Sequence, residues 1–200
     1  MDLSHRLIHW VAQNQKRIIF VLCAGIAFFG LLAAVTLWQQ KRESKAQGAL
    51  FLAGQEKQKL EQMAQDFPRS RAALIAMADL AAASLGAKDF EACFKGYEQL
   101  YEKSGRRAYF RILALHGMGT CLRGKGDYKT AATYFERASK DPENAGPLYS
   151  QFEAVKTLAM AKDPAAKAGF EALLKSKDLP PDLKEKIEEQ LSWLSPQKDS

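Results

Sequence analysis

Residues 109–139 read YFRILALHGMGTCLRGKGDYKTAATYFERAS, two apolar segments joined by the short turn Gly-Lys-Gly-Asp. Apolar residues recur at helical spacing on both sides of the turn, and no part of the stretch alternates with the period of two that a half-buried strand shows. Asp127 ends the turn, and aspartate is a residue type that caps the N-terminus of a helix. The stretch therefore predicts a pair of helices, 109–123 and 128–139.

The same helix pair recurs on both sides of this stretch. The additional pairs are 70–85 with 90–103, and 148–161 with 164–175. Asp89 and Asp163 each precede the second helix of their pair, where they can cap it, and Pro164 suits the first helical position. Three consecutive helix pairs, within residues 68–179, are therefore predicted.

Aligning the turns of the three pairs places residues of matching size in register. The aligned sets are Cys93, Ala131 and Ala166, then Tyr97, Phe135 and Phe170, then Leu100, Ala138 and Leu173. This is the tetratricopeptide pattern A-x3-F-x2-A, and Gly119 takes the small position where the second helix of the central pair approaches the first. A pair of this kind cannot bury its apolar face alone, so neighbouring pairs stack. We therefore predict an all-α protein with a short tetratricopeptide-like solenoid of helical hairpins.

The segments that border the repeats are also predicted to be helical. Segment 180–195 begins with two prolines and carries one apolar stripe, as expected of a C-terminal capping helix. On the other side, segment 39–67 is expected to continue the preceding helix outward until Phe67 and Pro68 end it. The last residues, 196–200, are predicted to be a disordered tail.

Residues 18–38 read IIFVLCAGIAFFGLLAAVTLW, which is 21 residues without a charge. At about 1.5 Å per residue such a helix reaches about 30 Å, the thickness of the hydrocarbon core of a bilayer. A secretory signal peptide has an apolar region of only about 7 to 15 residues. We therefore predict an uncleaved transmembrane helix that contacts the membrane through Ile18, Leu22, Phe29, Leu32 and Trp38. Residues 1–17 are predicted to be a tail with a short amphipathic helix at the membrane interface.

The sequence predicts no catalytic, cofactor or metal site. His5 and His9 precede the apolar span and His116 stands alone in a repeat helix, so the histidines form no single site. The carboxylates are scattered over solvated helix faces, where no environment would tune one as an acid and another as a base. We expect a binding protein rather than an enzyme.

Two of the cysteines, Cys93 and Cys121, occupy packing positions in adjacent helix pairs. Their expected role is that of small apolar core residues. A disulfide would require an oxidising compartment and Cα atoms within about 7 Å of each other. The unpaired state is the one we expect.

The formal net charge is +6, and basic residues concentrate around the central helix pair. Nucleic-acid binding would call for aromatic or glycine-rich interleaving, which the chain lacks. A basic groove for an acidic peptide, or contact with anionic headgroups near the apolar span, explains the charge better. The residues expected to bind a partner are Arg107, Tyr109, Arg111 and Arg123.

The order of these segments is similar to that of a known family. The chain resembles the YfgM-like family over most of its length. The resemblance rests on the order of its segments: a tail with the basic flank Lys16-Arg17, one apolar span, a long helix, Phe67-Pro68 with Ser70, and degenerate tetratricopeptide repeats. Members of that family are ancillary subunits of the bacterial Sec translocon. The resemblance implies an inner-membrane protein with a cytoplasmic N-terminus, whose periplasmic repeats contact the SecYEG translocon and periplasmic chaperones.

The distribution of basic residues favours the opposite orientation. Three precede the span, and five lie close behind it, namely Lys41, Arg42, Lys45, Lys57 and Lys59. Because large domains translocate largely regardless of loop charge, we follow the resemblance. The expected function is a membrane-anchored scaffold that links secretion to periplasmic chaperones. The alternative is an assembly factor for another envelope system, such as cytochrome maturation, pili or outer-membrane proteins.

Overall fold

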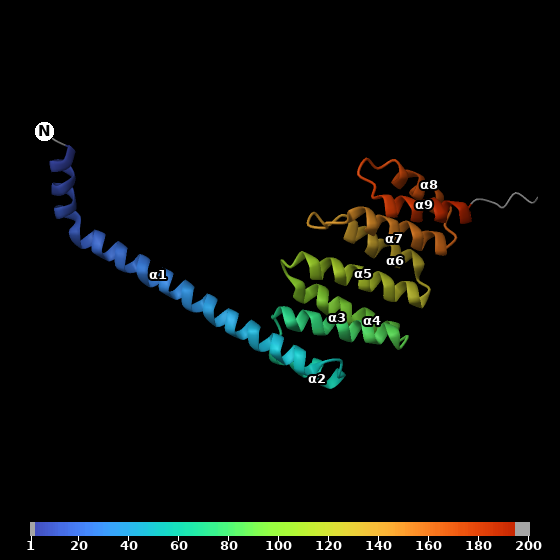
Figure 1. The fold of residues 1–200 in the computed structure, drawn as a ribbon, viewed down its shortest axis with the longest axis horizontal. Coiled ribbons are helices and arrows are strands. Elements are labelled where there is room, and N and C mark those ends of the chain that lie inside the picture. The colour runs from blue at the N-terminus through green and yellow to red at the C-terminus, as the bar shows by residue number, and fades with distance from the viewer. Residues whose placement is uncertain (1–2, 195–200) are drawn as a thin grey trace, which may run out of the picture.

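A computed structural model describes residues 3–194, and every regular element in that range is an α-helix (Figure 1). The helices are α1 (Leu3–Ala53), α2 (Lys57–Asp66), α3 (Arg71–Gly86), α4 (Phe90–Ser104), α5 (Ala108–Lys125), α6 (Tyr128–Ser139), α7 (Pro147–Met160), α8 (Ala165–Leu174) and α9 (Pro181–Leu194). The predicted all-α class is confirmed. The predicted disordered tail, 196–200, and the first two residues of the N-terminal tail lie outside the described residues.

Helix α1 extends away from the other helices as a long rod (Figure 1). Within the described residues it is the one helix long and apolar enough to cross a membrane, and its most apolar part is not buried in the protein. Phe29 is 71 % exposed, and Leu22, Leu32 and Trp38 are exposed as well. Ile18 lies on the same helix. The short helix predicted before the span is the first part of α1, and it bends away from the rest of that helix in Figure 1.

The prediction that segment 39–67 is one outward extension is wrong, because the chain turns back within it. Helix α1 ends at Ala53 and is followed by Gly54, whose φ of +56° is in the left-handed region that glycine adopts without strain. Helix α2 then packs against both α1 and α3. The reversal buries Leu60 and Met63, which a straight extension would leave in water. The end of α1 and α2 thus form an additional helix pair.

Helices α3 to α9 begin and end close to the predicted bounds, and each packs against the next along the chain. All the positions aligned in the repeat pattern are buried, including the aromatic residues Tyr97, Phe135 and Phe170. The predicted caps are present at two helices: the carboxylate of Asp89 accepts a hydrogen bond from the backbone N–H of Ala92 at 3.0 Å, and that of Asp127 accepts one from the N–H of Thr130 at 3.3 Å. The tetratricopeptide arrangement itself stays a prediction.

Close approach between helices depends on small residues. A Cβ atom added at Gly119 of α5 would lie 2.9 Å from the ring of Phe135 in α6, as the repeat pattern predicts for this glycine. A Cβ added at Gly117 would collide with the ring of Tyr97 in α4. Helix α5 therefore receives an aromatic ring from each of its two neighbours, and both rings rest on glycine.

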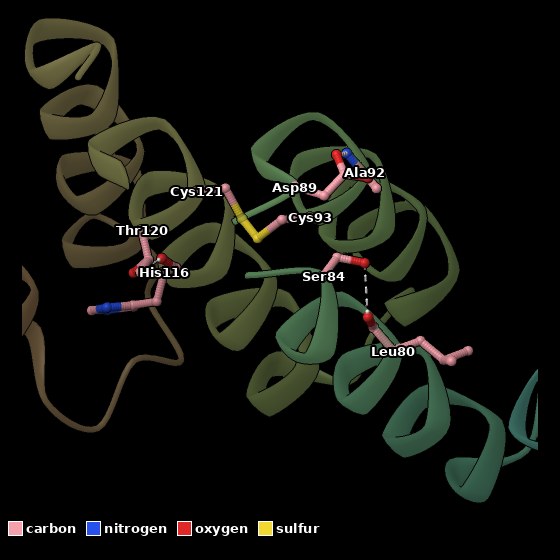
Figure 2. The surroundings of a disulfide bond; sticks show 8 residues. All are labelled: Leu80, Ser84, Asp89, Ala92, Cys93, His116, Thr120 and Cys121. Carbon is pink, nitrogen blue, oxygen red and sulfur yellow. Dashed lines mark hydrogen bonds between the residues drawn. A yellow bond between two sulfur atoms is a disulfide. The ribbon is translucent and has the colours of Figure 1, made fainter. Parts of the chain in front are cut away.

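The expectation that Cys93 and Cys121 are unpaired is wrong, because a disulfide joins them (Figure 2). Their Cα atoms are 5.9 Å apart, which is within the range that a disulfide spans. The tight packing of α4 on α5 brings the two positions into this range, and both residues are fully buried. The bond links the second helix of one pair to the first helix of the next.

Candidate partner-binding groove

A cavity of about 420 Å³ lies between α5, α7 and α9. We call it the groove, and it is lined by His116, Tyr149, Phe152, Glu153, Lys156, Lys186, Glu189 and Gln190. Helices α5 and α7 are the first helices of their pairs, and α9 is the predicted capping helix. The groove therefore lies on the side of the helix pairs that their first helices form.

His116 forms the α5 side of the groove. Its Nε2 lies 2.7 Å from the hydroxyl of Ser150 on α7, and its ring packs edge-on against Phe135 with 5.3 Å between the centroids. Burial lowers the pKa of the imidazole, and the nearby Arg123 lowers it further against the opposing effect of Glu153. His116 is therefore biased toward its neutral form, and it contacts both α6 and α7.

His116 and Ser150 are residue types that serve as general base and nucleophile in hydrolases, but the surroundings of this pair favour a structural role. Ser150 is only 1 % exposed, so a substrate does not reach its hydroxyl. That hydroxyl also accepts a hydrogen bond from the side-chain amide of Asn144 at 3.0 Å. Because this hydroxyl is inaccessible and is hydrogen-bonded to both Asn144 and His116, the pair is explained as a structural contact between α5 and α7.

An ion pair engages Glu153, one of the groove residues. The guanidinium of Arg123 on α5 lies 2.6 Å from the carboxylate of Glu153 on α7 and also stacks over the ring of Phe135. Both charged side chains are about a quarter exposed. Lys156 lies 3.8 Å from the same carboxylate and extends over the ring of Phe152. The negative charge of Glu153 is thus matched by two cations of the same domain.

Helix α9 is held to α7 by a hydroxyl and a carboxylate at the rim. The hydroxyl of Tyr149 donates to the carboxylate of Asp182 at 2.8 Å. Hydrogen bonding to this hydroxyl lowers the pKa of Asp182 and raises the pKa of Tyr149. Lys186 lies 3.3 Å from the same carboxylate, with its ammonium over the Tyr149 ring. The rim therefore presents an aromatic face and an ammonium group to whatever enters the groove.

The four residues predicted to bind a partner do not come together at one site. Arg123 does not line the groove and contacts it only through its ion pair with Glu153. Tyr109 is 69 % exposed, packs against Phe110 and does not line the groove. Arg107 lies at the N-terminus of α5, where its guanidinium donates to the carbonyl oxygen of Arg69 at 3.2 Å.

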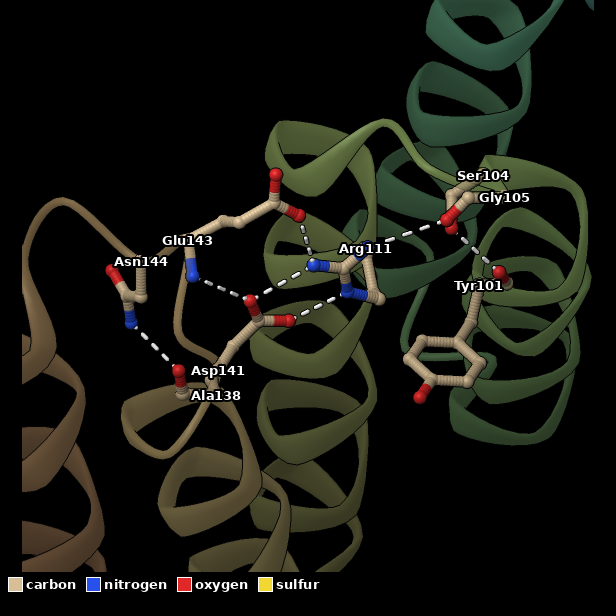
Figure 3. Close-up of polar contacts among 8 residues, drawn as sticks. All are labelled: Tyr101, Ser104, Gly105, Arg111, Ala138, Asp141, Glu143 and Asn144. Carbon is tan, nitrogen blue, oxygen red and sulfur yellow. Dashed lines mark hydrogen bonds and ion pairs between the residues drawn. The ribbon is translucent and has the colours of Figure 1, made fainter.

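Arg111 is engaged within the protein (Figure 3). Its guanidinium forms two hydrogen bonds with Asp141, at 2.6 and 2.9 Å, and one with Glu143 at 2.8 Å. It also donates to the carbonyl oxygen of Gly105 at 3.3 Å. These bonds, first of all the one to Asp141, raise the pKa of Arg111 and lower that of Asp141. The side chain therefore joins the loop after α6 to the start of α5 and is not available to a partner.

The sequence prediction does not include the groove residues of α7 and α9. The concentration of arginines directs attention to the central helix pair, and α9 is expected to be only a cap. The spacing of Tyr149 and Lys156 could have pointed to the α7 side of the groove. The two residues are seven positions apart on the first helix of a pair and so share one face. The contribution of α9 depends on how the last helices pack, which no local pattern specifies.

Within residues 3–194, no group of three or more His, Cys, Asp or Glu side chains is arranged to hold a metal ion. Comparisons with protein-family models, with curated proteins and with solved structures give no match to this chain. The groove itself offers apolar contact, hydrogen bonding and both signs of charge. This combination suits the binding of a protein segment.

Proposed function

We propose that this chain is a membrane-anchored scaffold and not an enzyme, and that its helical domain binds a segment of a partner protein in the groove. The observation that carries the proposal is the position of the groove, which lies between the first helices of successive pairs and is lined by Tyr149, Phe152 and charged side chains. Aromatic residues are enriched at protein-binding surfaces, where a polar rim surrounds them.

A repeat architecture supports the same function. Contacts between α1 and α3, between α3 and α5, and between α7 and α9 join the alternate helices along one side. Stacked pairs of this type present an extended surface formed by equivalent helices. The tetratricopeptide-like solenoid proposed for this chain would include the end of α1 as the first helix of an additional pair.

The compartment we propose for the helical domain is the periplasm, with α1 crossing the inner membrane once. The disulfide between Cys93 and Cys121 supports this orientation, because disulfides persist in oxidising compartments such as the bacterial periplasm. The resemblance to the YfgM-like family supports it independently. On these grounds the partners proposed are the SecYEG translocon and periplasmic chaperones.

A photocrosslinking experiment in native membranes tests this function. A photoreactive amino acid replaces Glu189, an exposed residue of the groove, in the full-length protein. The matched control carries it at Lys167, which is exposed on α8 and does not line the groove. A discrete adduct from position 189 that is absent from position 167, identified as a translocon or chaperone protein, is the expected result. Equal labelling from both positions would contradict a groove-specific partner.

Protease treatment of sealed inverted inner-membrane vesicles tests the orientation in the same preparation. The helical domain should be protected, because the lumen of such vesicles corresponds to the periplasm. Degradation of the domain without detergent would place it in the cytoplasm. In that case the crosslinked partner would have to be sought among cytoplasmic proteins.

A further inference from the structure

A second and larger cavity, of about 940 Å³, lies where the helical domain meets α1 at the end of the apolar segment. We call it the juxtamembrane cavity. Three parts of the chain form it: residues 38–43 of α1, the turn before α3, and the end of α4 with the turn that follows. Its lining residues include Trp38, Arg42, Glu43, Arg69, Lys103 and Arg106.

The cavity carries an excess of positive charge. Five cationic residues line it, Arg42, Arg69, Lys103, Arg106 and Arg107, against the two carboxylates Glu43 and Glu102. All five are exposed, and none forms an ion pair with a carboxylate of the part of the chain that the structure describes. Their charges are therefore available to an anionic ligand.

One of the two carboxylates has a separate structural task. Glu43 accepts hydrogen bonds from the backbone N–H of Arg71, at 2.9 and 3.1 Å, and of Ala72 at 3.4 Å. These donors belong to the first turn of α3, where N–H groups have no partner within the helix. Glu43 therefore ties α3 to α1, and it forms no ion pair with the neighbouring arginines, so the five cations of the cavity still outnumber its two carboxylates.

The depth of the cavity relative to a bilayer follows from the length of α1. Trp38 is the last residue of the apolar run, and tryptophan prefers the boundary between hydrocarbon and headgroups. From Trp38 to Glu43 the helix rises by about 8 Å. The headgroup layer on each side of a bilayer is about 5 to 8 Å deep. The cavity and the headgroups therefore occupy the same layer, and Arg42 packs over the Trp38 ring within it.

We infer that the juxtamembrane cavity binds the phosphate headgroups of anionic phospholipids in the leaflet next to the helical domain. The inference rests on the proposed membrane anchoring but on none of the proposed protein partners. Guanidinium groups match the geometry of phosphate oxygens. A lipid is favoured over an acidic protein segment because Trp38 is part of the cavity wall, so the site opens at the membrane surface. Lipid binding there would hold the domain, and hence the groove, at a set angle to the membrane.

Lipid retention by the full-length protein tests the inference. The protein is reconstituted into nanodiscs that contain equal amounts of phosphatidylcholine and phosphatidylglycerol, and the lipids released with it are counted by native mass spectrometry. The cavity variant is Lys103→Gln with Arg106→Gln, and the matched control is Lys129→Gln with Lys167→Gln, which removes the same charge from exposed positions outside the cavity. We expect the preference for phosphatidylglycerol to fall several-fold in the cavity variant and to stay unchanged in the control.

Each other outcome has a definite meaning. An equal fall in both variants would attribute the preference to net charge and overturn the inference, as would an unchanged preference in the cavity variant. If the cavity variant keeps its lipids but loses a crosslinked partner, the cavity binds an acidic protein instead. Failure of the wild-type protein to enter nanodiscs of phosphatidylcholine alone would refute the anchoring itself. Unfolding temperatures of both variants confirm that the domain is intact.

Discussion

The apolar part of α1 and helix α5 have the same secondary structure and opposite surroundings. Ile26 and Phe29 on α1 are 73 % and 71 % exposed, whereas Ala114 and Met118 on α5 are 0 % and 3 % exposed. Both helices are rich in apolar residues. Helix α5, however, carries glycines at the contacts with its neighbours and charged residues on the remaining face, while residues 18–38 carry no charge on any face.

The difference shows how the environment of a helix is encoded. A helix that packs inside a soluble domain needs a polar face and small residues where neighbours approach. A helix that is apolar on all sides and has no protein around it requires another apolar environment, which a bilayer supplies. Disturbing the two helices should therefore have separate consequences, one for membrane attachment and one for folding.

The largest effect is expected from charges placed in the apolar part of α1. Leu22→Asp combined with Phe29→Asp should abolish membrane attachment, because a charge at the centre of the span, where Phe29 lies, costs roughly 2.5 to 3.5 kcal/mol, and Leu22→Asp adds a second charge within the span. Together these costs are comparable to the whole gain from the apolar residues that remain, each of which contributes roughly 0.3 to 0.6 kcal/mol. Alkaline extraction of membranes should release the variant into the supernatant. Retention of the variant in the pellet would contradict the assignment of this segment as a span.

Truncation of a core aromatic should affect folding instead. Phe135→Ala removes a side chain that is 1 % exposed and packs on Gly119, so the free energy of unfolding should fall by about 3 to 5 kcal/mol. Denaturant titration of the protein in detergent measures this. Tyr109→Ala is the control, since its ring is 69 % exposed and its loss should change stability by less than about 0.5 kcal/mol. Attachment to the membrane should be unaltered in both.

The disulfide should contribute less than the core aromatic. Cys93→Ala with Cys121→Ala removes a bond between residues 28 apart in sequence, and we expect a loss of about 2 to 4 kcal/mol. A reductant should lower the unfolding temperature of the wild-type protein and leave that of the variant unchanged. Cys23→Ala, which removes the exposed free cysteine, serves as the control. A wild-type protein that is insensitive to reductant would show that the bond does not form.

The smallest effect is expected from the titration of His116. Burial lowers the pKa of this group below the ordinary value of 6.5, so the unfolded chain binds its proton more readily than the folded domain does. The stability of the domain should therefore decrease as the pH falls below 6.5. His116→Gln should reduce the pH dependence between 7.5 and 5, as measured by thermal unfolding. An unchanged pH dependence would assign it to other groups.

The sequence predicts the helices well because each helix is encoded by local signals. Asp89 and Asp127 cap helices as expected, and the aligned positions of the repeat pattern are buried. The extension after the span is predicted less well. Gly54 interrupts it, and whether a single glycine ends a helix depends on whether the chain gains by turning back. Here the gain comes from burying Leu60 and Met63 against α1 and α3, contacts that no local pattern reveals.

None of the four residues predicted to bind a partner lines the candidate groove. Arg111 and Arg123 have the residue type and position expected of a binding surface, yet acidic residues about 30 positions away engage both. The sequence shows how many charged side chains there are, whereas the packing of the helices determines which of them form ion pairs with one another. The same holds for Tyr149 and Lys186, whose proximity depends on the docking of α9 against α7.

Sequence alone therefore determined the helical class, the repeated pair and the apolar span, since periodicity, caps and the absence of charge act within a few turns of chain. Tertiary structure alone decided the reversal at Gly54, the bond between Cys93 and Cys121, and the two cavities. Each of these depends on the distance between helices that are separated in sequence. That distance is set by how side chains of both helices fit together, so neither helix specifies it by itself.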